Sequence, residues 1–174
     1  MTELKIGDII KFGEYHWLVL DVQEDKALII TEDVVEEREY HDENVDITWE
    51  NCTLRKYLNG EFLGKFDVER VVPTNNKNRH NLWHINIGGE DTVDSVFLLS
   101  FDDAITYFNE NIDRQAKFNG EHCCWWLRTQ KNYESKAIFI TWGGSTAGGE
   151  CVDVPVGVRP ALWLKLCGGN ENVD

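Results

Sequence analysis

Three short apolar runs follow one another at the start of the chain. They cover residues 6–12, 16–22 and 27–31, and polar residues separate them. Runs of this length, rich in Val, Ile, Leu and aromatic residues, are typical of β-strands, and the intervening Gly, Asp and Glu residues favour tight turns. The pattern predicts an N-terminal β-meander.

Two segments further along have the periodicity of a helix. Residues 50–58 place apolar side chains near one face, with Thr48 as the expected N-cap and the Asn-Gly pair at 59–60 as the expected end. Ser100 and Asp103 have the spacing of a capping box, so a second helix is expected to begin there. The sequence therefore predicts two main helices.

The last third of the chain returns to short apolar runs. Residues 124–128 and 137–142 are expected strands, and residues 150–154 are expected to pair back on the second of them as a hairpin. Residues 158–166 are expected to close the sheet as one strand. The stretch 74–94 is polar and rich in Asn and Gly, so it is expected to be a long loop.

The order of these elements indicates the fold class. Strands come first, then a helix, a loop, a strand, a helix and a final group of strands, so strand and helix do not alternate. We therefore expect an α+β fold with an antiparallel sheet and two main helices. A chain of 174 residues fits a single domain, here residues 1–167, with a flexible polar tail at 168–174.

The formal net charge of −14 narrows the classes of partner. Nucleic acids and anionic membranes attract Lys and Arg, so neither is an expected partner of this chain. Much of the acid lies within residues 32–46, where a solvated face explains it and a docking surface is the alternative. The five cysteines have no paired spacing and no apolar leader precedes them, so we expect reduced thiols and a cytoplasmic protein.

Motifs for metal or cofactor chemistry are weak. His80 and His84 have the spacing of a helical zinc pair, and His122 stands before two cysteines, but the Asn and Gly residues around the first pair oppose a helix. The Gly-rich run 143–149 lacks the strand–turn–helix context of a nucleophile elbow and the Gly-Lys-Ser/Thr of a phosphate loop. We expect neither a metal nor a cofactor.

Two arginines, Arg128 and Arg159, lie inside apolar runs. A buried guanidinium needs carboxylate or carbonyl partners, so each is expected to fasten a loop to the sheet, with anion capture at the sheet edge as the alternative. The same runs hold Trp125, Trp126 and Trp163, and most Trp side chains are expected in the core. These five residues are interpreted as structural.

The segment between the two Trp-rich runs, residues 129–155, is rich in Gly, Asn, Ser and Thr. Trp142 ends a predicted strand at the mouth of its glycine loop. An exposed Trp beside polar loop residues can stack on a sugar ring or anchor a peptide, and a core Trp beside the hairpin is the alternative. The candidate ligand-binding residues are Asn132, Tyr133, Trp142, Ser145, Thr146 and Asp153.

Several landmarks occur in an order that resembles a widespread uncharacterised bacterial domain family. Two of them are Trp-Trp-Leu-Arg at 125–128 and Gly-Val-Arg-Pro-Ala-Leu-Trp-Leu at 157–164, separated by a variable polar stretch. The others lie at 7–13, 17–22, 48–55, 58–62 and 94–100. The resemblance covers nearly the whole chain and implies a domain of unknown function.

The closing part of this pattern is similar to the C-type-lectin-like fold. That fold is shared by formylglycine-generating (sulfatase-modifying) enzymes and by phage and bacterial variable ligand-binding proteins. The resemblance implies that the core strands form a scaffold and that residues 129–155 face a ligand. The family usually continues Trp-Trp-Leu-Arg with Ser-Pro-Gly, whereas this chain has Thr129-Gln130-Lys131.

Three functions are consistent with these features. The leading expectation is a non-enzymatic binding module for a carbohydrate or a protein surface, acting through residues 129–155. One alternative is a cysteine-dependent modifying enzyme of the formylglycine-generating type, which would use Cys123, Cys124 or Cys151 with a nearby His. The other is an accessory or interaction domain of a larger bacterial system, docking through its acidic face.

Overall fold

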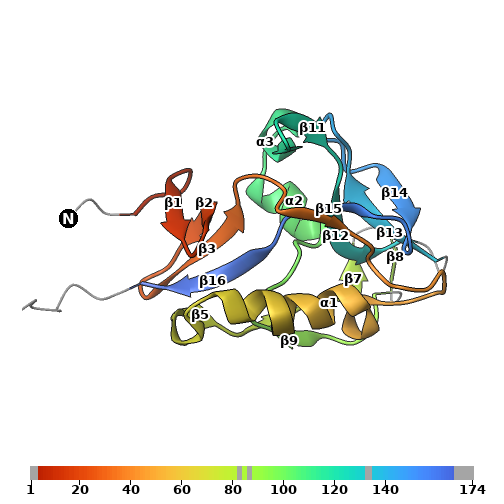
Figure 1. Cartoon of the computed structure of the whole chain (residues 1–174), viewed down its shortest axis with the longest axis horizontal. Coiled ribbons are helices and arrows are strands. Elements are labelled where there is room, and N and C mark those ends of the chain that lie inside the picture. The colour runs from red at the N-terminus through yellow and green to blue at the C-terminus, as the bar shows by residue number, and fades with distance from the viewer. Residues whose placement is uncertain (1–3, 82–83, 86–87, 132–134, 167–174) are drawn as a thin grey trace, which may run out of the picture.

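The computed structural model describes residues 4–81, 84–85, 88–131 and 135–166 of the chain. It is a mixed structure with mostly antiparallel strand pairs and few helices, which confirms the expected class at this level. Two five-stranded sheets lie toward opposite ends of the long axis (Figure 1). The expectation of one sheet is therefore wrong.

The first sheet combines both ends of the described chain. Its strands are β1 (Ile9–Phe12), β2 (Tyr15–Val22), β3 (Lys26–Thr31), β5 (Val71–Val72) and β16 (Ala161–Lys165). They lie in the order β1-β2-β3-β16-β5, and every pair is antiparallel. The predicted N-terminal meander is confirmed, and β16 pairs with β3 with Leu162 opposite Ile29.

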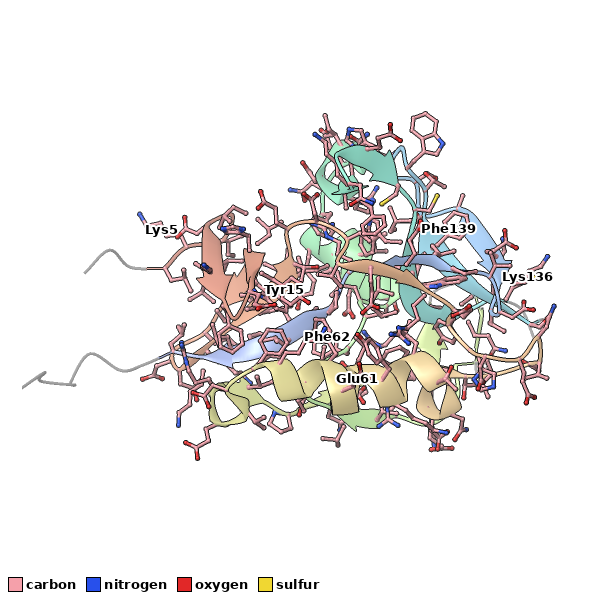
Figure 2. The ribbon with its side chains drawn as sticks, viewed as in Figure 1. Lys5, Tyr15, Glu61, Phe62, Lys136 and Phe139 are labelled. Carbon is pink, nitrogen blue, oxygen red and sulfur yellow. The ribbon has the colours of Figure 1, made fainter. Side chains whose placement is uncertain are left out.

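The second sheet contains the predicted C-terminal hairpin. Its strands are β4 (Glu36–Arg38), β12 (Trp125–Gln130), β13 (Lys136–Ile140), β14 (Gly148–Cys151) and β15 (Val156–Val158). They lie in the order β14-β13-β12-β15-β4, and β12 pairs with β15 in parallel. Phe139 lies opposite Gly148 in the β13–β14 hairpin, and Figure 2 shows Phe139 and Lys136 on this part of the molecule.

The predicted strand over 158–166 is broken at Arg159 and Pro160. β15 ends at Val158 in the second sheet, and β16 begins at Ala161 in the first. Pro160 has no N–H to donate to a ladder, and its carbonyl accepts the Thr31 N–H at 3.0 Å. The chain therefore passes directly from one sheet to the other at this dipeptide.

One long helical segment runs below both sheets in the view of Figure 1. It consists of a 3₁₀ turn (Trp49–Asn51), α1 (Thr53–Tyr57), a π-helical turn (Leu58–Phe62) and two further 3₁₀ turns (Leu63–Lys65 and Val68–Arg70). Thr48 precedes the first turn but makes no side-chain cap, and the Cys52 Sγ instead accepts the Arg55 N–H at 3.4 Å.

The prediction that Asn59-Gly60 ends this helix is wrong. Asn59 lies in the π-helical turn, where its Oδ1 accepts the Ser95 N–H at 2.8 Å and its Nδ2 donates to the Val96 carbonyl at 2.8 Å. Asn59 therefore fastens the helical segment to residues 95–96 instead of ending it.

Two shorter helices complete the helical content of the described residues. They are α2 (Phe101–Tyr107) and α3 (Asn111–Arg114). The predicted capping box is confirmed, because Ser100 Oγ accepts the Asp103 N–H at 3.0 Å and Asp103 Oδ2 accepts the Ser100 N–H at 2.8 Å.

Three small hairpins connect these elements. They pair β6 (Thr74–Asn76) with β9 (Thr92–Asp94), β7 (His80–Asn81) with β8 (His84–Ile85), and β10 (Ala116–Phe118) with β11 (Glu121–Cys123). The stretch 74–94 is therefore not the structureless loop that its composition predicts, because its two ends pair with each other.

Tryptophans form much of the core. Trp17, Trp49, Trp125 and Trp126 are at most 1% exposed, and each indole N–H has a hydrogen-bond acceptor. Between the first sheet and the helical segment, the rings of Tyr15 and Phe62 lie 5.6 Å apart and face one another (Figure 2). Buried apolar residues of both sheets and of the helices make one continuous cluster.

Candidate functional site

Trp142 lies two residues after the end of β13, and it is 68% exposed. Its turn is held by internal hydrogen bonds. The Thr141 N–H donates to the Ser145 carbonyl at 2.9 Å, the Gly144 N–H donates to the Thr141 carbonyl at 2.8 Å, and Thr141 Oγ1 accepts the Ser145 N–H at 3.0 Å. The backbone that carries Trp142 is therefore fixed while its indole faces solvent.

A buried arginine fastens this turn to α3. The Arg114 Nε donates to the Gly144 carbonyl at 2.8 Å, and its Nη2 donates to Asn111 Oδ1 at 2.6 Å. Gly144 has φ +86°, and a Cβ at this position would lie 1.7 Å from the Asn111 carbonyl oxygen. Glycine is required here by both the backbone conformation and the contact with α3.

The structure brings some of the predicted ligand-binding residues together and separates one. Ser145 and Thr146 share the turn of Trp142. Asp153 is exposed but follows β14, at the end of the hairpin where Lys136 lies opposite Cys151, and thus at the opposite end from Trp142. Asn132 and Tyr133 lie outside the described residues.

Arg159 is buried between the two sheets. Its Nε donates to the Thr31 carbonyl at 2.8 Å and its Nη2 to the Glu32 carbonyl at 3.0 Å, while its guanidinium lies 5.0 Å from the centre of the Trp125 ring. Burial lowers the pKa of Arg159 to about 10, so it remains a cation at neutral pH. These contacts fasten residues 31–32 to the point where the chain changes sheets.

Arg128 makes the contacts expected of a structural arginine, and it also lines a pocket. Its Nη1 donates to the Leu98 carbonyl at 2.8 Å and to Asp103 Oδ2 at 2.6 Å, and its Nε donates to Asn78 Oδ1 at 3.0 Å. Its Nη2 makes a longer bond, 3.4 Å, to the Lys77 carbonyl. Arg128 thereby links β12, α2 and the segment after β6.

This pocket has a volume of about 600 Å³ and was not predicted from the sequence. It lies among β3, β16, α2, β12 and the segment around β6, and none of the described residues of 129–155 lines it. Its inner wall is apolar and comes from Leu28, Phe97, Leu99 and Trp163, and its remaining lining is mainly polar or charged. The volume is within the range of small-molecule sites.

The pocket was missed because its lining comes from stretches far apart in the sequence. Each stretch has a different local pattern, and none of them contains a catalytic or ligand-binding motif. The one signal available was an arginine inside an apolar strand, for which the sequence offered anion capture at the sheet edge as the alternative to a structural role.

The four cysteines among the described residues are free thiols. Burial raises the pKa of Cys52 to about 12 and that of Cys123 to about 11, so both thiols stay protonated at neutral pH. Cys151 lies opposite Lys136, whereas Cys124 precedes Trp125 at the other end of the β12–β13 ladder. Within the described residues no group of three or more His, Cys, Asp or Glu side chains is placed to hold a metal ion.

Comparisons with known proteins add a family assignment. A family model described as a domain of unknown function (DUF6273) matches residues 24–166. No curated protein and no solved structure matches the chain. Among the helices of the described residues, none has the length and hydropathy needed to cross a membrane.

Proposed function

The chain belongs to DUF6273, a family of domains of unknown function, and we propose that this member is a non-enzymatic binding module. It holds a carbohydrate or protein surface through residues 129–155, with Trp142 as the anchor. The observation that carries the proposal is the 68% exposure of Trp142 on a turn fixed by hydrogen bonds. A large aromatic side chain held in this way loses little conformational entropy when a partner covers it.

The surroundings of Trp142 support a binding surface. Ile112 is 67% exposed and belongs to α3, the helix that contacts Gly144 in the turn of Trp142. Glu110 and Asp113, on either side of Ile112 in the sequence, are also exposed. Apolar residues with acidic neighbours suit a partner that presents aliphatic or sugar C–H groups together with hydrogen-bond donors.

The resemblance to a C-type-lectin-like fold is part of the same proposal. In that fold the segment between the two core strands is the ligand-facing one, and here β12 and β15 enclose residues 131–155. The cysteine-dependent enzyme is less well supported, because the Cys123 thiol has a raised pKa of about 11 and is a weak nucleophile at neutral pH.

The test compares wild type with Trp142→Ala on glycan and protein arrays. We expect wild-type hits to weaken at least about tenfold in Trp142→Ala, because hot-spot Trp truncations typically cost about 2 kcal/mol or more. Val68→Ala is the matched control, since Val68 is 52% exposed on a different element. It should keep every hit.

Both variants should unfold at the wild-type denaturant concentration, because both side chains are exposed. An absence of hits for wild type on both arrays contradicts the proposal. Hits that Trp142→Ala retains in full contradict it as well.

A further inference from the structure

We infer that the pocket beside Arg128 is a second, separate site that binds a small neutral polyhydroxylated ligand, a monosaccharide or disaccharide. This inference does not depend on Trp142, because Trp142 does not line the pocket. The volume of about 600 Å³ is sufficient for a ligand of this size.

The charges that line the pocket are balanced. Three basic and three acidic side chains contribute to it: Lys77, Arg79, Arg128, Asp91, Asp102 and Asp103. This balance contrasts with the formal net charge of −14 for the whole chain. The pocket is therefore a locally neutral place on an acidic molecule, and it offers no excess of charge to an ionic ligand.

Four of these six charges form two ion pairs within the pocket, and Arg79 pairs with Glu90 outside the lining. Arg128 Nη1 lies 2.6 Å from Asp103 Oδ2, and Lys77 Nζ lies 3.1 Å from Asp91 Oδ2. An anion would have to displace a carboxylate from its basic partner and a cation would have to displace the base. A hydroxyl group can donate to the carboxylate and accept from the base while both pairs remain.

Hydrogen-bonding groups remain available beside these pairs. Within the described residues, no hydrogen bond engages the Tyr107 hydroxyl or the Asn75 side-chain amide, and both residues line the pocket. Arg128 Nη2 carries two N–H bonds and makes one long bond of 3.4 Å. Burial, followed by the nearby Asp103 and Asp21 charges, raises the pKa of Tyr107, so its hydroxyl is a neutral donor at pH 7.

Sugar binding also requires an apolar contact for the C–H groups of the ring, and the apolar lining residues can provide it. Leu28, Phe97 and Leu99 are at most 3% exposed, and Trp163 is 9% exposed. Of the four, Trp163 retains the most exposed surface, so it is the apolar side chain that the C–H face of a sugar ring can contact while the sugar hydroxyls meet the polar lining.

The polar lining is held in place before any ligand enters. Asn78 accepts from Arg128 Nε through its Oδ1 and donates its N–H to Asp91 Oδ1 at 2.9 Å. Asn76 donates to the buried Asp94 carboxylate at 2.8 Å. Such fixed side chains reduce the ordering that binding requires.

Isothermal titration calorimetry tests the inference with glucose, N-acetylglucosamine and maltose as neutral probes. Glucuronate, an anion, and glucosamine, titrated at pH 6 where it is a cation, are charged probes of nearly the same shape. We expect at least one neutral probe to bind with a millimolar or lower dissociation constant and its charged counterparts to bind more weakly. Failure of all three neutral probes, or tighter binding of glucuronate than of glucose, overturns the inference.

Two conservative substitutions locate the site. The double variant Asn75→Ala/Tyr107→Phe removes two hydrogen-bonding groups that have no partner in the described protein, so it should fold normally and weaken binding about tenfold. Val68→Ala is the control, since Val68 is 52% exposed and does not line the pocket, and it should bind the neutral probe as wild type does. Unchanged binding by the double variant, or an equal loss of binding in Val68→Ala, refutes the assignment of the site to this pocket.

Discussion

Asp94 is a buried carboxylate that joins several segments of the chain. Its Oδ2 accepts from Trp49 Nε1 at 3.0 Å, from Asn76 Nδ2 at 2.8 Å and from Thr92 Oγ1 at 2.7 Å, and its Oδ1 accepts from Arg55 Nε at 2.6 Å. Burial by itself would raise the pKa of the Asp94 carboxyl, but these hydrogen bonds lower it below its usual value. The ionised form is thus the one the fold stabilises.

Replacing this carboxylate by an amide should destabilise the protein. Asp94→Asn removes the charge that faces Arg55 and turns an acceptor into a donor among other donors, which we expect to cost about 3 kcal/mol in the free energy of unfolding. Urea unfolding measures it. Asp153→Asn, at an exposed position, is the control and should stay within about 0.5 kcal/mol of wild type. An Asp94→Asn variant as stable as this control would contradict the role given to Asp94.

Asp94 also makes the stability of the folded state depend on pH, in a direction that can be predicted. The pKa of Asp94 is lower in the folded state than the value of about 3.9 for an unfolded chain. The stabilisation of the folded state by ionised Asp94 is therefore fully present above the unfolded pKa. It is lost as the pH falls through the folded pKa. Between about pH 5 and pH 3, wild type should lose more stability than Asp94→Asn, and equal slopes would contradict this assignment.

At the scale of elements, the turn after β13 depends on one glycine. Gly144→Ala would place a Cβ 1.7 Å from the Asn111 carbonyl oxygen at a backbone φ of +86°. Because the Cβ cannot rotate away and the oxygen belongs to the Asn111 backbone, we expect a loss of about 2 kcal/mol in stability and displacement of the Trp142 turn from α3. Thermal unfolding measures the first effect, and array binding measures the second.

Gly64→Ala is the matched control. No atom lies within 4 Å of the Cβ that it would add, and Gly64 is in a 3₁₀ turn of the helical segment. It should leave stability unchanged or raise it slightly. If Gly144→Ala and Gly64→Ala unfolded at the same temperature, the contact between the turn and α3 would not be the constraint described.

Local chemistry explains which elements were predictable from the sequence. The meander, the β13–β14 hairpin and the Ser100–Asp103 capping box depend on neighbouring residues, and the structure contains all three. The π-helical turn around Asn59 and the sheet change at Pro160 depend on partners far away in the sequence, namely residues 95–96 and Thr31. Tertiary contacts of this kind override local propensity and leave no local pattern to read.

The two candidate sites also differ in whether the sequence could predict them. Trp142 could be singled out because a Trp beside a glycine-rich turn is visible in the sequence, and whether it binds a partner stays a prediction. The pocket could not be foreseen, since Asn75, Tyr107 and Arg128 come together only after β6, α2 and β12 have packed against the first sheet.

At the scale of the whole molecule, the two sheets share one core. Buried residues from both sheets, including Trp17, Trp125 and Trp163, belong to a single apolar cluster. We therefore expect one cooperative unfolding transition, as for a single domain over residues 1–167. Urea curves from tryptophan fluorescence and from far-UV circular dichroism should coincide, and two separated transitions would show that the sheets unfold independently.

The position of β16 has a consequence for how the protein is made. This strand lies between β3 and β5 in the first sheet, although it is the last strand of the described chain. During translation, β3 and β5 emerge long before β16, the strand that pairs with both of them. The hydrogen bond from the Thr31 N–H to the Pro160 carbonyl likewise forms only after Pro160 has been added to the chain. The nascent chain therefore keeps apolar edges unpaired until residues 161–165 have left the ribosome, which makes the ribosome-bound stage the period when a chaperone is most needed.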